Sequence, residues 1–160
     1  MIRAAVLTVS DKGAQGLRED RSGPTARGLL EGLGIQVVAY EVVPDDRPLI
    51  ETRLRSWADG GQTDLIVTTG GTGLAARDVT PEATLAVIER PVPGMAEAMR
   101  AASLKATPLA MLSRGVVGQR GKTLIVNLPG SPQAVVECLQ ALAAALPHAI
   151  AIIKGESTEH

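Results

Sequence analysis

The chain has 160 residues, the usual size of one domain and too short for two ordinary ones. Sixteen Lys and Arg against 17 Asp and Glu give a formal net charge of −1, which excludes a strongly basic nucleic-acid binder. Trp57 and Tyr40 are the only aromatic residues, so the base-stacking sheets of RNA-recognition modules and OB-folds are also excluded. One cysteine, Cys138, excludes an intramolecular disulfide and a cysteine-rich zinc site.

The sequence has no pattern typical of a secretion signal or a membrane span. Met1 leads directly into a strand-like run without a cleavage site. The longest apolar stretch, residues 139–153, is interrupted by Gln140, Pro147 and His148, and it is shorter than the roughly 20 residues that a bilayer requires. We therefore expect a cytoplasmic protein with neither a membrane nor a nucleic-acid partner.

Short apolar runs alternate with segments in which apolar residues recur every three or four positions. The runs are typical of buried strands, and the spacing is typical of amphipathic helices. In chain order, the sequence first predicts a strand at 4–9, a helix opened by Gly23-Pro24 and ended by Gly34, and a strand at 35–43. A helix capped by Asp46 follows, with Ile50, Leu54 and Trp57 on its apolar face, and then a strand at 65–69, a helix starting at Thr80-Pro81 and a helix from Pro93 to about Lys105. The last predicted elements are strands at 109–112 and 123–127 and a long helix capped by Ser131-Pro132, with Val135, Leu139, Leu142 and Leu146 on one face.

Solidly apolar strands that alternate with helices indicate a mostly parallel sheet covered by helices on both sides. The predicted fold class is therefore α/β, a three-layer α/β/α sandwich. Residues 118–121 could turn a local hairpin, which would add one antiparallel edge strand. Because no linker or internal repeat is present, we predict a single domain over residues 1–154, followed by a polar tail at 155–160.

Polar and glycine-rich residues follow the predicted strands one after another. In an open α/β sheet, ligands bind beyond the carboxyl ends of the strands, where such loops come together. Five loops with this bias are better evidence of a site than any one of them alone. The loops contain Ser10-Asp11, Asp45-Asp46, Gly70-Gly71-Thr72-Gly73, Ser113-Arg114 and Pro129-Gly130-Ser131.

Residues 68–73 read Thr-Thr-Gly-Gly-Thr-Gly. Glycine lets backbone N–H groups approach an anion closely, and threonine hydroxyls add hydrogen bonds, so the run is a candidate phosphate-binding loop. A tight turn between a strand and a helix would use the same residues. The flanking threonines and the extension to Arg77-Asp78 favour phosphate binding, although the run matches neither the dinucleotide fingerprint nor the Walker motif.

A second candidate anion site lies at residues 127–132, Asn-Leu-Pro-Gly-Ser-Pro, which join a strand to a helix. The N–H groups at a helix N-terminus lack partners, and the dipole end is positive, so phosphate binds well there. Taken alone, the segment is better explained as a simple cap, with Ser131 at the N-cap and Pro132 at the first helical position.

Four carboxylates, those of Asp11, Asp45, Asp46 and Asp78, fall in these loops. At phosphate-handling sites, Mg²⁺ is usually held by one or two carboxylates together with substrate oxygens. Asp46 and Asp78 could instead cap helices, whereas Asp45 has no evident local role. Cys138 lies near the apolar face of its helix, so we expect a small buried side chain.

Together these motifs resemble one family. Residues 68–84, TTGGTGLAARDVTPEAT, closely resemble the signature of MogA-type molybdopterin adenylyltransferases, whose domain also occurs as the G domain of gephyrin. The resemblance covers nearly the whole chain, in the family's order, although Met95-Ala96 replaces an aromatic residue and a glycine found in many relatives. The other similar segments are LTVSD (7–11), VPDD (43–46), PGMAEAMR (93–100), SLKATPLAMLSRG (103–115) and NLPGSP (127–132).

The resemblance implies an enzyme of molybdenum cofactor biosynthesis that uses ATP and Mg²⁺. It would transfer AMP from ATP to the terminal phosphate of molybdopterin, giving adenylyl-molybdopterin and pyrophosphate. Asp45 and Asp78 match the family's catalytic, metal-binding acidic positions. The nucleotide-binding positions are matched by Gly70, Gly71, Thr72, Gly73, Asn127, Pro129, Gly130 and Ser131, and the pterin-binding positions by Ser103, Ser113 and Arg114.

The resemblance further implies a homotrimer that passes its product to a molybdate-insertion protein. Two other interpretations stay open: a MoaB-type relative with weak or no transferase activity, and a pterin-binding or scaffold module. Asp45 and Asp78 favour the enzyme, because a scaffold has no need of two loop carboxylates.

Overall fold

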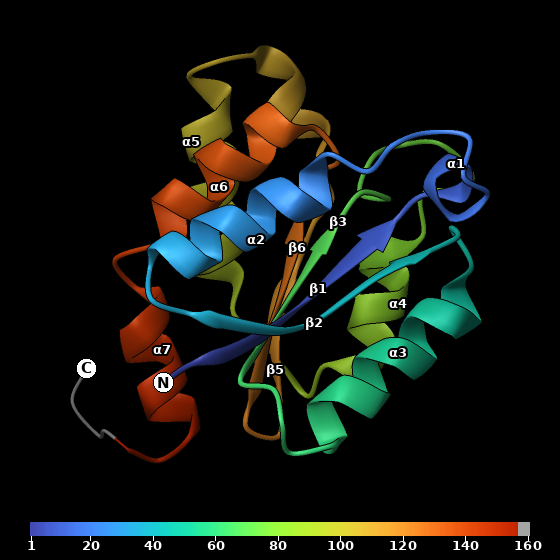
Figure 1. Cartoon of the computed structure of the whole chain (residues 1–160). Coiled ribbons are helices and arrows are strands. Elements are labelled where there is room, and N and C mark those ends of the chain that lie inside the picture. The colour runs from blue at the N-terminus through green and yellow to red at the C-terminus, as the bar shows by residue number, and fades with distance from the viewer. Residues whose placement is uncertain (157–160) are drawn as a thin grey trace.

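The computed structural model describes residues 1–156, and in this part of the chain six strands form one sheet (Figure 1). Their order across the sheet is β2-β1-β3-β6-β5-β4. β1, β2, β3 and β6 are parallel to one another, whereas β5 runs antiparallel to both of its neighbours. The strands are β1 (Arg3–Val9), β2 (Gln36–Val43), β3 (Leu65–Thr69), β4 (Arg90–Pro91), β5 (Val117–Arg120) and β6 (Thr123–Leu128).

Helices cover both faces of this sheet (Figure 1). Side chains that alternate along β1, β3 and β6 point in turn to the two faces, so each face has its own apolar core. One face packs against α2, α5, α6 and α7, and the other against α3 and α4. The helices are α1 (Asp11–Ala14), α2 (Ser22–Gly32), α3 (Arg47–Asp59), α4 (Thr80–Val87), α5 (Pro93–Leu104), the 3-10 helix η1 (Pro108–Leu112), α6 (Pro132–Leu142) and α7 (Leu146–Ile153). The predicted three-layer α/β/α class is confirmed.

The antiparallel strand arises from a hairpin between β5 and β6. Arg120 pairs with Thr123, so Gly121 and Lys122 form the turn, and Gly121 has a φ of +54° that suits glycine. The short strand β4 pairs with the outer side of β5 and forms the edge of the sheet. The predicted hairpin is therefore present, with one more strand outside it.

The strand predicted at residues 109–112 is wrong, because these residues lie in the 3-10 helix η1. Pro108 has no N–H to donate to a sheet, and the Oγ1 of Thr107 accepts a hydrogen bond from the Leu109 N–H at 3.2 Å, which caps a helical turn. Leu109 and Met111 are also 68% and 63% exposed, unlike residues of a buried strand.

The long helix predicted from Ser131 through Leu146 is broken between Leu142 and Leu146. Pro147 explains the break, because inside a continuous helix its ring would clash with the carbonyl of Ala143. The two resulting helices, α6 and α7, meet at 66°, and within residues 1–156 no single helix is long and apolar enough to cross a membrane. Residues 157–160 of the predicted tail lie outside the described residues.

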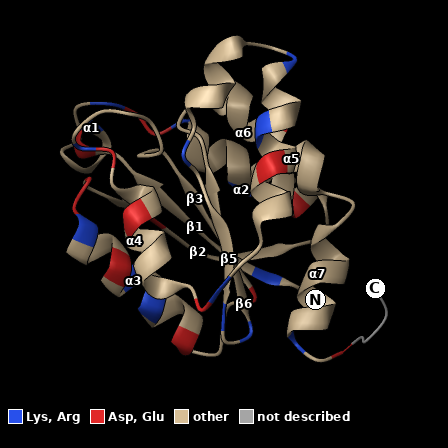
Figure 2. Ribbon diagram, turned by 180° about the vertical axis from the view of Figure 1, so that it is seen from behind, with Lys and Arg blue, Asp and Glu red and all other residues tan. Residues whose placement is uncertain are grey.

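Positively and negatively charged residues alternate along α3 (Figure 2). The carboxylate of Glu51 pairs with Arg47 at 3.2 Å and with Arg55 at 3.5 Å, one turn away on either side. Such pairs lie on the solvent face of a helix, which leaves Ile50 and Leu54 to the core.

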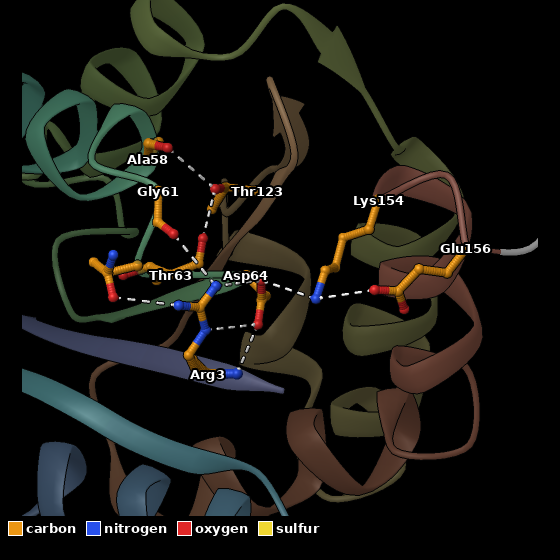
Figure 3. A network of polar contacts seen from close by, with 9 residues as sticks. Arg3, Ala58, Gly61, Thr63, Asp64, Thr123, Lys154 and Glu156 are labelled. Atoms are coloured by element: carbon orange, nitrogen blue, oxygen red, sulfur yellow. Dashed lines mark hydrogen bonds and ion pairs between the residues drawn. The ribbon is translucent and has the colours of Figure 1, made fainter. Parts of the chain in front are cut away.

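A polar network closes the end of the sheet where the parallel strands begin (Figure 3). Asp64, just before β3, accepts the Arg3 backbone N–H at 2.8 Å and pairs with the guanidinium of Arg3 and the ammonium of Lys154. Thr123 donates its hydroxyl to the Thr63 carbonyl at 2.8 Å. The network attaches the end of α7 to β1 and β3. The glycine-rich and acidic loops lie at the opposite end of the sheet, where the parallel strands end.

Candidate active site

The loops that carry the predicted site meet at one edge of the sheet. Thr8 of β1 pairs with Thr69 of β3, and Thr69 pairs with Leu128 of β6, so the three strands end at the same level. The Gly70 N–H donates to the Leu128 carbonyl at 3.2 Å, which brings the two glycine-containing loops into contact. The parallel register therefore brings together loops that lie far apart in the sequence.

Two cavities open at this edge. The first, which we call the α5–α6 cavity, has a volume of about 400 Å³ and lies among α5, η1 and α6. The second, the α1–α2 cavity, has a volume of about 740 Å³ and lies beyond β1 and β3, against the segment between α1 and α2. Gly71, Asp78 and Gly130 line both cavities, so ligands in the two would meet at these residues.

The glycines of residues 70–73 leave room for two carboxylates. A Cβ on Gly73 would lie 2.8 Å from Asp78 Oδ2, and one on Gly71 would lie 3.2 Å from Asp45 Oδ1 and 2.3 Å from Thr80 Oγ1. Gly70 and Gly71 also have φ values of +88° and +70°, which other residues rarely adopt. Asp45 and Asp78, which come from loops after different strands, thus face the same short stretch of backbone.

Asp45 is held by a reciprocal contact with Asp11. The Asp11 N–H donates to Asp45 Oδ2 at 2.9 Å, and the Asp45 N–H donates to Asp11 Oδ1 at 3.0 Å. Arg77 completes the arrangement with two bonds to the Asp11 carboxylate, at 2.7 and 2.9 Å. Sequence reasoning missed this local role of Asp45, because the two aspartates are 34 positions apart.

The charges around Asp45 and Asp11 affect the two carboxyls in opposite ways. Burial raises the pKa of Asp45, and the nearby negative charges of Asp11 and Asp78 raise it further. The hydrogen bond from the Asp11 N–H and the charge of Arg77 act against this rise. The bonds from Arg77 lower the pKa of Asp11. A cation beside Asp45 and Asp78 would therefore relieve a repulsion that the chain itself creates.

The side chains of Asp46 and Asp78, which the sequence offered as possible helix caps, do not cap helices. Asp78 Oδ2 accepts the Ala75 N–H at 3.0 Å within its own loop, and Val79 is the N-cap of α4. Asp46 occupies the N-cap position of α3, as predicted, but its side chain makes no capping hydrogen bond. Ser131 does cap α6, because its Oγ accepts the Ala134 N–H at 3.1 Å.

The residues predicted for nucleotide binding divide between the two cavities. Gly70 and Ser131 line the α1–α2 cavity, and Gly71 and Gly130 line both. The other four line the α5–α6 cavity: Thr72, Gly73, Asn127 and Pro129.

The side chain of Asn127 makes its hydrogen bonds inside the protein. Its Nδ2 donates to Thr68 Oγ1 at 3.1 Å and to Thr84 Oγ1 at 2.9 Å, and its Oδ1 accepts the Val116 N–H at 3.1 Å. The residue is 1% exposed. Asn127 therefore joins β6, β3, α4 and the segment before β5 beneath the site.

Ser103 and Ser113, predicted for the pterin side, both line the α5–α6 cavity. Ser103 is buried and donates its hydroxyl to Glu137 Oε1 at 3.0 Å, while the thiol of Cys138 lies 3.6 Å from the same hydroxyl. Cys138 is buried, as predicted, and burial raises the pKa of its thiol. Arg114 makes contacts of a different kind: its Nε, Nη1 and Nη2 each bond to a group of the chain.

Several residues at the site escaped the sequence analysis. Arg100 and Glu137 line the α5–α6 cavity from the middle of α5 and α6, and Arg100 Nη1 donates to the Gly115 carbonyl at 2.9 Å. Asp20 lines the α1–α2 cavity and accepts bonds from Thr8, Ser22, Tyr40 and the Gly23 N–H. The spacing of Arg100 from Ser103 along one helix was the one available signal, because residues three apart share a face.

The site fits a divalent cation only together with a substrate. Within the described residues, no group of three or more acidic, His or Cys side chains could hold a metal ion by itself. Asp45 and Asp78 each accept a backbone N–H at Oδ2, and among the described residues Oδ1 of each has no hydrogen bond and is free to bind a cation. Two carboxylates plus phosphate oxygens and water are the donor set that Mg²⁺ prefers.

Comparisons with known proteins agree on one family. Residues 5–148 match the family described as a probable molybdopterin binding domain. Molybdopterin adenylyltransferases of Helicobacter pylori and Escherichia coli K12 are 46% and 36% identical to the chain, over 96% and 99% of it and 89% and 88% of their own lengths. The structure of the molybdopterin biosynthesis enzyme MoaB from Thermus thermophilus is 54% identical, covers 97% of this chain and 98% of its own, and has a TM-score of 0.92.

Proposed function

The chain belongs to the molybdopterin-binding domain family, and we propose that it transfers the adenylyl group of ATP to the terminal phosphate of molybdopterin. The observation that carries this proposal is the junction of the two cavities at Gly71, Asp78 and Gly130. A transfer between two substrates requires that their reacting groups meet, and this junction is where ligands of the two cavities would do so. The names of the relatives support the same activity.

We assign molybdopterin to the α5–α6 cavity and ATP to the α1–α2 cavity. This assignment puts four residues that the family resemblance gave to the nucleotide on the molybdopterin side: Thr72, Gly73, Asn127 and Pro129. The first is walled by apolar residues of α5 and η1 and by hydrogen-bonding groups of Arg100, Ser103, Ser113 and Glu137, which suits a flat heterocycle with polar edges. The second is larger and presents Arg18 and Arg21 together with the start of α6. Guanidinium groups and a helix N-terminus both suit phosphates, so the triphosphate belongs there.

Asp45 and Asp78 are the residues that would hold Mg²⁺ in this activity. When bound, Mg²⁺ would neutralise charge on the phosphates of ATP as pyrophosphate departs. The backbone N–H groups of Asp11 and Ala75 fix the two carboxylates in place, so the chain does not have to reorganise when substrates arrive.

The reaction needs little covalent chemistry from the protein. A terminal phosphate oxygen of molybdopterin attacks the α-phosphorus of ATP, the new O–P bond forms, and the bond from that phosphorus to the pyrophosphate oxygen breaks. The attacking phosphate is already an anion at neutral pH, so no base has to remove a proton from it. The loops at 70–73 and 129–131 contribute by aligning the two phosphates, which can supply most of the rate enhancement.

The proposal includes the setting of the reaction. The enzyme works in the cytoplasm as a homotrimer and passes adenylyl-molybdopterin to a molybdate-insertion protein. These points follow from the family resemblance of the sequence motifs.

The direct test is product formation under anaerobic conditions. Protein, ATP, Mg²⁺ and molybdopterin are incubated, and adenylyl-molybdopterin and pyrophosphate are measured against blanks without protein and without molybdopterin. We expect both products in equal amounts and no ATP consumption when molybdopterin is omitted. Binding of both substrates with no product above the blank would contradict the transferase and favour a MoaB-type relative or a scaffold module.

A further inference from the structure

Arg114 directs its whole guanidinium at the glycine-containing loop and the helix that follows it. Nε donates to the Gly73 carbonyl at 2.8 Å, and Nη2 donates to the Asp78 carbonyl at 2.8 Å. Nη1 forms an ion pair with Glu82 of α4 at 2.7 Å. The backbone N–H of Arg114 adds a bond to the Thr72 carbonyl at 2.8 Å. One residue thus contacts both ends of the segment 72–78.

This segment is closed by few other bonds. The Ala75 N–H donates to Asp78 Oδ2 at 3.0 Å, and the Asp78 N–H donates to the Ala75 carbonyl at 2.9 Å. Both of these bonds lie inside the segment, so they shape it without attaching it to the rest of the protein. Outside it, the Thr80 N–H reaches the Gly71 carbonyl at 3.1 Å. Arg77 also attaches the segment, through two bonds from its exposed side chain to the Asp11 carboxylate at 2.7 and 2.9 Å. The Arg114 guanidinium is the attachment that bonds the backbone of Asp78 itself.

A second arginine anchors Arg114 itself. Arg100 Nη1 donates to the carbonyls of Ser113 and Gly115, at 3.3 and 2.9 Å, so it holds the residues on both sides of Arg114. Arg100 and Ser113 also line the α5–α6 cavity. Because these bonds go to the backbone on both sides of Arg114, they hold that wall of the cavity independently of the Arg114 side chain.

We propose that Arg114 is a positioning residue, which sets the Asp78 carboxylate at the junction of the two cavities and does not bind the pterin phosphate. The kinetic part of this inference rests on the proposed function. A guanidinium can do this because its planar fork donates in several fixed directions at once, whereas the lysine ammonium is a compact point charge that cannot span two carbonyls and a carboxylate in the same geometry.

Replacing Arg114 should lower kcat more than it weakens the binding of molybdopterin. If segment 72–78 loses its bonds to the Arg114 guanidinium, Asp78 is misplaced while the walls that hold molybdopterin remain. Misplacement by about 1 Å can slow a reaction by up to about 100-fold, so Arg114→Lys should lower kcat by about 10- to 100-fold. The dissociation constant of molybdopterin should change by less than about threefold, since the lining at Ser103 and Ser113 is retained.

The experiment compares Arg114→Lys with Arg120→Lys as a matched control. Arg120 also bonds a carbonyl, that of Val87, and pairs with a carboxylate, that of Asp59, but it lies at the opposite end of the sheet. For each variant we would measure kcat, the dissociation constants of ATP and molybdopterin, the melting temperature, and amide hydrogen exchange in residues 70–80. Arg114→Ala would be assayed with and without millimolar guanidinium chloride, against NaCl at the same ionic strength.

We expect Arg114→Lys to lower kcat as stated and to speed exchange in residues 70–80 by about tenfold or more, because opening of that segment becomes easier. Guanidinium should restore part of the kcat of Arg114→Ala, while Arg120→Lys should leave kcat and this exchange unchanged. An Arg114→Lys enzyme with normal kcat and normal exchange would overturn the proposal. So would an increase in the molybdopterin dissociation constant that accounts for the whole defect, or an equal loss of kcat in Arg120→Lys.

The exchange measurement separates this inference from the proposed function. If the wild-type protein makes no adenylyl-molybdopterin, the proposed function fails. Faster exchange in Arg114→Lys alone would then still support the brace, and unchanged exchange would overturn it.

Discussion

At the scale of single residues, the site depends on positions where a side chain is missing. Gly71 has no space for a Cβ, which would lie 2.3 Å from Thr80 Oγ1 and close to Asp45, and its φ is +70°. Thr80 Oγ1 is itself buried and has no hydrogen-bond partner within the described residues. The carboxylates and the glycine thus share one small volume.

Gly71→Ala should therefore damage both stability and turnover. Strain at positive φ costs about 1–3 kcal/mol, and the collision with Thr80 and Asp45 adds to it. We expect a lower melting temperature and a kcat at least about tenfold lower, since the loop must shift beside Asp45. The measurement is thermal unfolding together with adenylyl transfer at a temperature where the variant is folded.

Gly121→Ala is the matched control, because Gly121 also has a positive φ, +54°, but has nothing within 4 Å of a Cβ. It should lose about 1 kcal/mol of stability and keep a normal kcat. Equal kinetic loss in the two variants would show that strain alone, and not crowding at the site, explains the effect.

The two carboxylates allow a second test. Asp45→Asn and Asp78→Asn keep an oxygen that can accept the N–H of Asp11 or Ala75, so the loops should keep their shape. They lose the charge that would hold Mg²⁺, which is worth several kcal/mol in the transition state, so kcat should fall by at least about 100-fold. Binding of molybdopterin and the melting temperature should stay close to wild type. Near-normal turnover in both variants would refute the catalytic assignment, and a large drop in melting temperature would indicate a structural role.

At the scale of elements, the sequence predicts best where one local rule decides the outcome. The strands at the centre of the sheet follow from short apolar runs such as 65–67, which are fully buried. Residues 109–112 look equally apolar, but local bonding at Thr107 and Pro108 makes them helical, and nothing covers Leu109 in the described chain. Apolar character alone does not distinguish a buried strand from an exposed turn of helix.

The parts of the site that could be predicted are those that follow strands. Asp45 and Asp78 were found because parallel strands end at a common edge, whatever the distance between them along the chain. Arg100, Glu137 and the internal role of Asn127 could not be found in this way. Their positions depend on how α5, α6 and α4 pack across the sheet, and the sequence signals this only through the spacing of Arg100 and Ser103 along one helix.

The polar network of Asp64, Arg3 and Lys154, at the end of the sheet where the parallel strands begin, predicts how stability depends on pH (Figure 3). Burial alone would raise the pKa of Asp64, but hydrogen bonds from Arg3 and the charge of Lys154 outweigh it and lower the pKa below its usual 3.8. The folded state therefore binds protons less readily than the unfolded state. The resulting stabilisation is complete above pH of about 4, and it is lost as the pH falls through the folded-state value.

Asp64→Asn should be less stable than wild type by about 1.5–3 kcal/mol at pH 7, because a side chain that is 5% exposed loses the negative charge that strengthens its bonds to Arg3 and Lys154. Denaturant unfolding at pH 7 and at pH 3 measures the difference, which should shrink at the lower pH. Adenylyl transfer should be normal, since the network lies at the far end of the sheet. A stability difference that is independent of pH would contradict the ionised role of Asp64.

At the scale of the whole molecule, the first question is assembly. The family resemblance predicts a homotrimer. Analytical ultracentrifugation at micromolar concentrations should give a mass close to three chains, in one species that does not dissociate on dilution. A monomer mass over that range would contradict the prediction, and turnover measured on the same samples would show whether activity needs the assembly.

The second question is whether the two cavities act as separate binding sites. Ser103 lines the α5–α6 cavity but not the α1–α2 cavity, and Ser131 lines the α1–α2 cavity but not the α5–α6 cavity. The Ser131 hydroxyl, whose oxygen accepts the Ala134 N–H, should donate a hydrogen bond to a charged oxygen of ATP, worth about 1.5–3 kcal/mol, or about 10- to 150-fold in affinity. The Ser103 hydroxyl donates to Glu137 and should act by holding that carboxylate in the wall of the molybdopterin cavity. Ser103→Ala should therefore weaken molybdopterin binding, and so should Ser113→Ala, whereas Ser131→Ala should weaken ATP binding.

The opposite substrate provides the control within each variant. Calorimetric titration of ATP into Ser103→Ala and of molybdopterin into Ser131→Ala should give affinities within about threefold of wild type, because residues on separate walls contribute almost additively. Ser131→Ala should also lose about 1 kcal/mol of stability, since Ser131 caps α6, and Ser103→Ala should not show this capping loss. An equal loss of affinity for both substrates in either variant would mean that the two cavities behave as one site. It would contradict the proposal that two separately bound phosphates meet at the junction beside Asp78.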